Sequence, residues 1–292
     1  MKLPGRGSAI SRRWYERIIE KGLFASAAAA ILIVLLIGGF VLAEGFPIIT
    51  GHGAAFLFGR TWSPLAGEFG IFPMIMGTFY VTAGALLLGL PVGLACAVYL
   101  AEFAPAWFAR LIRPAVQLLA GIPSVVYGFF GVVVLVPFIM DNLGGWGFSV
   151  LAGALVLALM ILPTIISISE DAIRAVPVSY KEGSLSLGAT HWQTIKKVLL
   201  PTARSGIVAS IVLGMGRAIG ETMAVIMVVG NVVALPHSIL DPVRTLTANV
   251  ALEMGYAFGD HTRALFATGV VLFMVIILLN MFLLLLPKRM GT

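Results

Sequence analysis

Long apolar stretches dominate the pattern of hydrophobic and polar positions along this chain. A bilayer core of about 30 Å needs roughly 20 apolar residues per spanning helix, whereas the strands of an outer-membrane barrel show only a weak alternation. The pattern therefore predicts an all-α integral membrane protein with six transmembrane helices. The apolar windows lie at 23–43, 73–100, 114–139, 147–169, 206–233 and 264–287.

The composition agrees with this fold class. Hydrophobic residues make up 60% of the 292 residues, charged residues only 11%, and the mean hydropathy is +1.04. Soluble domains carry about 25% charged residues. The net charge of +6 does not indicate a nucleic-acid partner, because the basic residues flank the apolar windows instead of forming one basic face. We expect membrane lipid to surround the apolar helices.

The basic residues also predict the orientation of the helices. If the N-terminus is cytoplasmic, the inside segments hold six, two, five and two Lys or Arg residues, whereas the outside segments hold only Arg60, Arg244 and Arg263. Cytoplasmic segments are enriched in Lys and Arg. We therefore predict a multi-pass protein of the bacterial inner (plasma) membrane with both termini in the cytoplasm.

The chain then divides into consecutive segments. The first window is too long for a cleaved signal peptide, whose apolar region spans roughly 7–15 residues. In the outside loop 234–263, Leu246, Val250 and Met254 recur every four residues and predict a short amphipathic helix, either a docking surface or a lid on the bundle. The predicted segments are a cytoplasmic amphipathic N-terminus (1–22), the first helix (23–43), a periplasmic loop (44–72), a five-helix core (73–287) with the inside loop 170–206, and a cytoplasmic tail (288–292).

The inside loop 170–206 carries five basic residues and a helical pattern in which Trp192, Ile195 and Val198 recur every three residues. Gly188 permits a sharp turn between two short helices. Such an amphipathic pair needs a partner. No lysine in the chain follows a glycine, so a Walker A phosphate loop is absent, and we expect neither enzymatic activity nor a bound cofactor.

The same loop resembles a family motif. Glu182-Gly183-Ser184-x3-Gly188, nine further residues, then Val198-Leu199-Leu200-Pro201 is similar to the Glu-Ala-Ala-x3-Gly-x9-Ile-x-Leu-Pro loop of binding-protein-dependent ABC importer permeases. The resemblance implies a type I ABC importer permease fold and helices that dock in a cleft of a separate ATPase subunit, which binds ATP and Mg²⁺. The residues assigned to this ATPase coupling are Glu182, Gly183, Ser184, Leu187, Gly188, Ala189, Thr190 and Pro201.

Further motifs resemble the phosphate-specific permeases of this family, of the PstC type and CysTW-like. They begin at Trp62-Ser63-Pro64 and include Gly121-Ile122-Pro123-Ser124 and Gly216-Arg217-Ala218-Ile219-Gly220-Glu221-Thr222. The resemblance implies an inorganic phosphate importer that works by alternating access. Its implied partners are a second permease (PstA type), an ATPase dimer (PstB type), and a periplasmic or lipid-anchored phosphate-binding protein (PstS type).

Two charged residues in the fifth window are candidates for the substrate pathway. A charge within a membrane costs about 2.5–3.5 kcal/mol on the insertion scale, so Arg217 and Glu221, one helical turn apart, should face a partner or a water-filled path. A guanidinium matches phosphate oxygens. The alternative is a structural ion pair.

Ser124 and Tyr127 in the third window offer hydroxyls either to the anion or to neighbouring helices. The four histidines are scattered through loops, and we expect no metal site.

Alternative functions stay open at this point. Sulfate or molybdate could replace phosphate as the oxyanion carried by an ABC permease. An ion-coupled anion carrier needs no ATPase, but the halves of the chain show no obvious inverted repeat.

Overall fold

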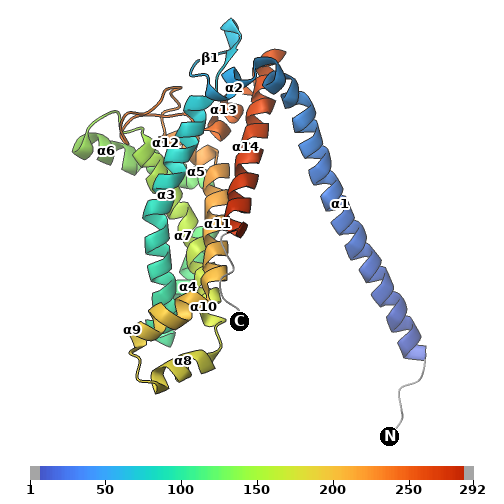
Figure 1. Ribbon diagram of the computed structural model, residues 1–292, viewed down its shortest axis with the longest axis vertical. Coiled ribbons are helices and arrows are strands. Elements are labelled where there is room, and N and C mark those ends of the chain that lie inside the picture. The colour runs from blue at the N-terminus through green and yellow to red at the C-terminus, as the bar shows by residue number, and fades with distance from the viewer. Residues whose placement is uncertain (1–6, 286–292) are drawn as a thin grey trace.

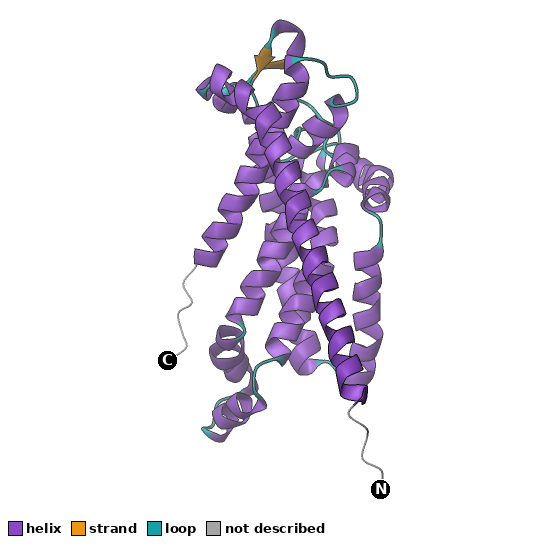
Figure 2. Ribbon diagram, turned by 90° about the vertical axis from the view of Figure 1, so that its right-hand side faces the viewer, coloured by secondary structure: helices purple, strands orange, loops and turns teal. Residues whose placement is uncertain are grey.

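The computed structural model describes residues 7–285 and is almost entirely helical (Figures 1 and 2). Residues 1–6 and the predicted tail at 288–292 lie outside the described residues. Five helical segments are long and apolar enough to cross a membrane, and a sixth arises if one bent helix pair counts as a span. The predicted all-α membrane fold is confirmed.

The spanning segments differ from the predicted windows mainly at their ends. Near its C-terminal end the second span changes from α-helical to π-helical geometry, and the third contains a π-helical turn in its middle. The spanning elements are α1 (Gly7–His52), α3 (Phe72–Val98) with η2 (Tyr99–Phe103), α5 (Ser124–Phe130) with η3 (Gly131–Leu135) and α6 (Val136–Leu143), α7 (Val150–Arg174), and α14 (Asp260–Leu285).

Shorter elements connect them. Between the second and third spans lies α4 (Ala106–Gly121). After α7 come α8 (Val178–Ser186), α9 (His191–Thr194), η4 (Ile195–Leu199), α10 (Leu200–Thr202) and α11 (Arg204–Gly220), and then α12 (Met223–Val228) and α13 (Leu246–Glu253). Figure 1 shows α8, α9 and α10 at one end of the molecule. The other end holds α2 (Ala54–Phe58) and a hairpin of β1 (Trp62–Ser63), η1 (Pro64–Ala66) and β2 (Glu68–Phe69), in which Trp62 pairs with Phe69.

The predicted bounds of three windows are wrong. Residues 7–22 and 44–52 belong to the single helix α1, because no capping residue or proline stops the helix at either predicted end. Residues 114–121 belong to α4, and the third span begins only after Pro123. The fifth window is not one helix, since α11 ends at Gly220 and α12 starts at Met223.

α1 leans away from the other helices (Figure 1). None of the residues in its most apolar window is buried within the chain. Its later half meets α14, where the rings of Phe40 and Phe266 lie 5.4 Å apart in an edge-to-face arrangement. The backbones approach closely there, since a Cβ on Gly45 would lie 2.7 Å from the backbone nitrogen of Ala267.

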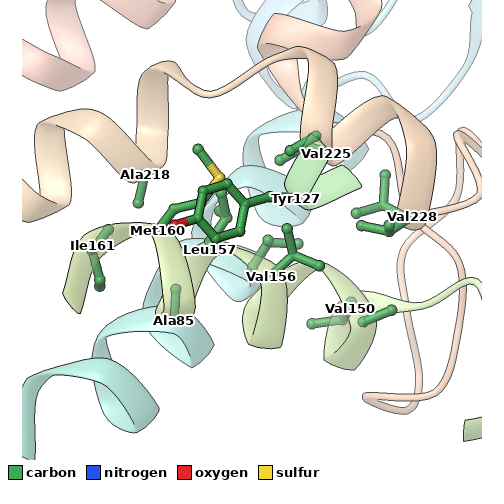
Figure 3. Close-up of a cluster of buried hydrophobic side chains, with 14 of the residues drawn as sticks. Ala85, Tyr127, Val150, Val156, Leu157, Met160, Ile161, Ala218, Val225 and Val228 are labelled. Carbon is green, nitrogen blue, oxygen red and sulfur yellow. The ribbon is translucent and has the colours of Figure 1, made fainter. Parts of the chain in front are cut away.

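The core surrounds α7, which packs along most of α3 and also against α11. Side chains from α3, α5, α7, α11 and α12 converge in one cluster that includes Ala85, Tyr127, Leu157, Ala218 and Val228 (Figure 3). This cluster fixes the short helices α5 and α12 beside α7.

Glycines allow α3 and α7 to approach each other. A Cβ on Gly93 would lie 2.8 Å from Cγ2 of Ile165. We expect Gly93→Val to overpack this contact and to lower stability by about 1–3 kcal/mol, measured as a lower unfolding midpoint in detergent. Gly39→Val on α1, where a Cβ meets nothing within 4 Å, is the control. Equal midpoints for the two variants would contradict the expectation.

Candidate transport path and coupling surface

At one end of the molecule α8, α9, η4 and α10 form a helix–turn–helix, which we call the coupling end (Figure 1). The turn needs Gly188, whose φ is +82°, a conformation that side chains with a Cβ rarely adopt. Thr190 then starts α9 with a capping box, because its hydroxyl accepts from the Gln193 amide and the Gln193 side chain accepts from the Thr190 amide. The predicted turn between two short helices is confirmed.

The coupling end exposes large apolar side chains beside charged ones. Leu187 is 91% exposed and Trp192 61% exposed. Glu182 and Gly183 are exposed as well, as is Pro201 in the first turn of α10. Exposed apolar patches of this kind mark interaction surfaces. Several of the motif residues are thus accessible at the coupling end, while their contact with an ATPase stays a prediction.

The inner side of the same element is packed. Ile195 and Leu199 are buried with Val98 of α3 and Ile173 of α7. Within the element, the hydroxyls of Ser184 and Thr194 lie 3.0 Å apart and link α8 to α9. Residues 191–202 and 204–220 form two helices bent by 68°, so the coupling end leads directly into α11.

Replacement of the turn glycine has a measurable expected effect. Gly188→Ala forces a Cβ into a left-handed backbone conformation, which costs about 1–2 kcal/mol. We expect hydrogen exchange at the amides of Leu187 and Ala189, which bond back to α8, to become faster by roughly 5- to 30-fold. Gly183→Ala is the control, since its site is equally open but helical. No difference in exchange between the variants would contradict this expectation.

Arg217 and Glu221 lie where α11 ends, not within a continuous helix as predicted. Arg217 is in the last turn, whereas Glu221 has an extended backbone with ψ of 132°. Glu221 Oε1 accepts from the amide of Ala224 and thereby caps α12. In the described chain no ion pair joins Arg217 to Glu221, so the alternative of a structural ion pair does not hold within this helix, and a pair with a sister subunit stays open.

The Arg217 guanidinium is half-buried and makes no hydrogen bond or ion pair with any described residue. A cation in an apolar helix bundle needs an anionic partner or water. Arg217 therefore presents a cationic group that no described residue pairs with, at the break between α11 and α12.

The two predicted hydroxyl groups lie at different places on α5. Tyr127 is buried, and its hydroxyl donates to the carbonyl of Leu119 on α4 at 2.8 Å, so it bonds between helices. Ser124 is half-exposed in the first turn of α5. A role of either residue in the substrate pathway stays a prediction.

Three buried or half-buried carboxylates escaped the sequence analysis. Glu170 accepts from Arg113 and Arg174, each at 2.8 Å. Glu102 contacts Lys181 and His191 at the coupling end. At the opposite end Glu253 contacts Arg244, Trp62 and His261. Glu102 and Glu170 each lie at the edge of an apolar window, and this position was the sequence feature that could have indicated their contacts. Within residues 7–285 no group of three His, Cys, Asp or Glu side chains could hold a metal ion.

The predicted amphipathic helix in the loop 234–263 is confirmed as α13, and it is buried. Leu246, Ala248 and Asn249 are almost fully covered, with Thr78 of α3 accepting the amide of Leu246 through its hydroxyl. Of the two interpretations left open, the burial favours a lid on the bundle. We call α2, the hairpin β1–β2, the segment 229–245 and α13 together the cap.

Residues 89–291 match the family described as the binding-protein-dependent transport system inner membrane component. This chain belongs to that family. It is thus a multi-pass membrane transport subunit. Among relatives of this permease, the probable ABC transporter permease protein YqgH of Bacillus subtilis is 44% identical over 255 residues, covering 86% of this chain and 82% of the relative.

Other relatives of the permease carry more specific names. The phosphate transport system permease protein PstC of Mesorhizobium japonicum is 37% identical over 276 residues, covering 86% of this chain and 84% of the relative. The protein of the same name from Haemophilus influenzae is 35% identical over 291 residues, covering 91% and 90%. The predicted resemblance to permeases of the PstC type is confirmed.

Solved structures share the fold of this permease. A chain of a bacterial ABC transporter involved in the import of the acidic polysaccharide alginate superposes with a TM-score of 0.60 at 17% identity, covering 94% of this chain and 100% of that one. A chain of the inward-facing MetNI methionine ABC transporter gives a TM-score of 0.54 at 23% identity, covering 76% and 96%. The predicted type I ABC importer permease fold is confirmed.

Proposed function

We propose that this chain is the permease subunit of an ATP-driven importer of inorganic phosphate. The observation that carries the choice of an anion is Arg217, a guanidinium without a partner in the described chain at the break between α11 and α12. A guanidinium fork matches phosphate oxygens and stays charged at every physiological pH. The names of the PstC relatives support phosphate as that anion.

The energy for transport comes from a separate subunit in this proposal. The sequence contains no Walker A loop, whereas the coupling end exposes Leu187 and Trp192 for a partner. We infer that an ATPase dimer of the PstB type binds there and holds the ATP and Mg²⁺. Its conformational cycle would move α9 and α10, and through the 68° bend the helix that carries Arg217.

The remaining partners follow from the same proposal. A second permease of the PstA type completes the path, and a phosphate-binding protein of the PstS type delivers the anion to the cap. In this proposal the coupling end and both termini face the cytoplasm, an orientation that the distribution of Lys and Arg favours. α1 starts at the same end of the molecule as the coupling end, and α14 runs back toward that end (Figure 1), which supports termini on one side of the membrane.

Transport by the reconstituted complex tests the proposal. Liposomes that contain this chain with its copurifying subunits should accumulate labelled phosphate only with ATP and the binding protein. An excess of sulfate or molybdate should not compete. Competition by either anion would assign the site to another oxyanion. Uptake by this chain alone without ATP would favour an ion-coupled carrier.

A further inference from the structure

Glu102 joins the coupling end to the second span. Its Oε2 accepts from Lys181 Nζ of α8 at 2.6 Å and lies 3.0 Å from His191 Nε2 of α9. The Glu102 side chain is 10% exposed, whereas those of Lys181 and His191 are 34% and 39% exposed, so the contact is only partly shielded from water. The ring of neighbouring Phe103 lies 5.0 Å from the His191 ring. A single carboxylate thus contacts both helices of the helix–turn–helix.

The helix α8 has little else that holds it. None of its nine residues is buried. Within the described chain, its side chains form hydrogen bonds to other elements only at Lys181, with Glu102, and at Ser184, with Thr194 of α9. Because α8 carries the motif residues Glu182 and Gly183, the Lys181–Glu102 contact is its direct polar link to a membrane-spanning helix.

The segment η2 that carries Glu102 is itself firmly anchored. Its π-helical geometry ends the span that begins with α3, and π-helical turns often occur at functional positions. The last four carbonyls of a helix lack partners within it. One of them, Leu100 O, accepts from Arg174 Nη2 of α7 at 2.6 Å. A displacement of the Glu102 side chain therefore affects α3 directly and, through the Leu100 carbonyl, also α7.

We propose that Glu102 is a positioning residue that transmits movement of α8 and α9 to α3. This inference rests on the proposed function, in which an ATPase moves the coupling end. Two routes then lead from that end into the membrane. One runs along the chain through the bend into α11 and Arg217. The other crosses through Glu102 to α3, which packs along α7, so both sides of the bundle move together.

Transport per ATP hydrolysed, measured on the complete complex in liposomes, tests this role. Glu102→Ala should copurify with the ATPase at normal yield, but phosphate transported per ATP should fall by at least about twofold. The charge exchange Glu102→Lys with Lys181→Glu should restore most of the ratio. Asp171→Ala on α7 is the matched control, because this exposed carboxylate has no side-chain partner in the described chain.

A distance measurement separates this inference from the proposed function. Spin labels at Ser179 of α8 and Ala115 of α4, in a Cys96→Ser background, report the position of α8 in the complex without substrate. Glu102→Ala should broaden the distance distribution, and the charge exchange should narrow it again. A wild-type complex that carries no phosphate would refute the proposed function but leave this readout valid.

Two results would overturn the role of Glu102. One is an assembled Glu102→Ala complex with normal transport per ATP and an unchanged distance distribution. The other is a loss of assembly that the charge exchange does not restore, which would make Glu102 a residue of folding alone.

Discussion

Replacement of Arg217 by glutamine is expected to lower phosphate uptake at least about tenfold in complexes that still assemble. A charge-assisted hydrogen bond contributes about 1.5–3 kcal/mol. The guanidinium can donate two such hydrogen bonds to the same phosphate group. Since no described residue pairs with Arg217, its loss leaves no buried acid unpaired in this chain. The measurement is the initial rate of labelled phosphate uptake into proteoliposomes.

The control for this experiment lies on the same helix. Arg204 starts α11, is exposed and has no side-chain partner in the described part of the chain, so Arg204→Gln should keep uptake close to the wild-type rate. Arg217→Lys keeps the charge but not the fork and should give an intermediate rate. Wild-type uptake by the Arg217→Gln complex would remove the anion-contact role.

The second large effect is expected for Glu253, which ties the cap together. Its Oε1 accepts from Arg244 Nη1 at 2.6 Å, and its Oε2 accepts from the indole nitrogen of Trp62 at 2.8 Å and lies 2.8 Å from His261 Nε2. The Glu253 side chain is 8% exposed and that of Arg244 18%. Glu253→Ala leaves a shielded guanidinium without its counter-ion, which costs about 3–5 kcal/mol.

Thermal unfolding in detergent, followed by tryptophan fluorescence, measures this loss. We expect the midpoint of Glu253→Ala to fall by several degrees, since 1 kcal/mol shifts it by about 2–4 °C in a chain of comparable size. Glu68→Ala in the same cap removes an exposed carboxylate that makes no side-chain contact with the described residues and should leave the midpoint unchanged. Equal midpoints for both variants would show that the Glu253 contacts add nothing to stability.

The sequence revealed the number and order of the spans because the bilayer imposes a minimum apolar length on each. It did not reveal their breaks. Glu221 and Thr222 are two polar residues within a long apolar stretch, so a hydropathy window averages over them and hides the end of α11. In the same way α4 ends in apolar residues that merge with the next span, although Pro123 marks the boundary.

The candidate site was predictable only where its chemistry is local in sequence. The turn at Gly188 depends on neighbouring residues and was predicted, whereas the capping box at Thr190 is equally local but was not. The carboxylate contacts depend on distant partners. Glu102 and Lys181 are separated by 79 positions, and nothing in the residues between them specifies that they meet.

The contact between Trp62 and Glu253 also limits when the cap can close during synthesis. The two residues are 191 positions apart, and His261 follows later still. While the chain emerges from the ribosome, the hairpin at 62–69 is made long before its acceptor carboxylate exists. The Trp62 indole therefore lacks its final partner until synthesis has nearly ended. Closure of the cap is a late step, because His261, which also contacts Glu253, belongs to the last helix.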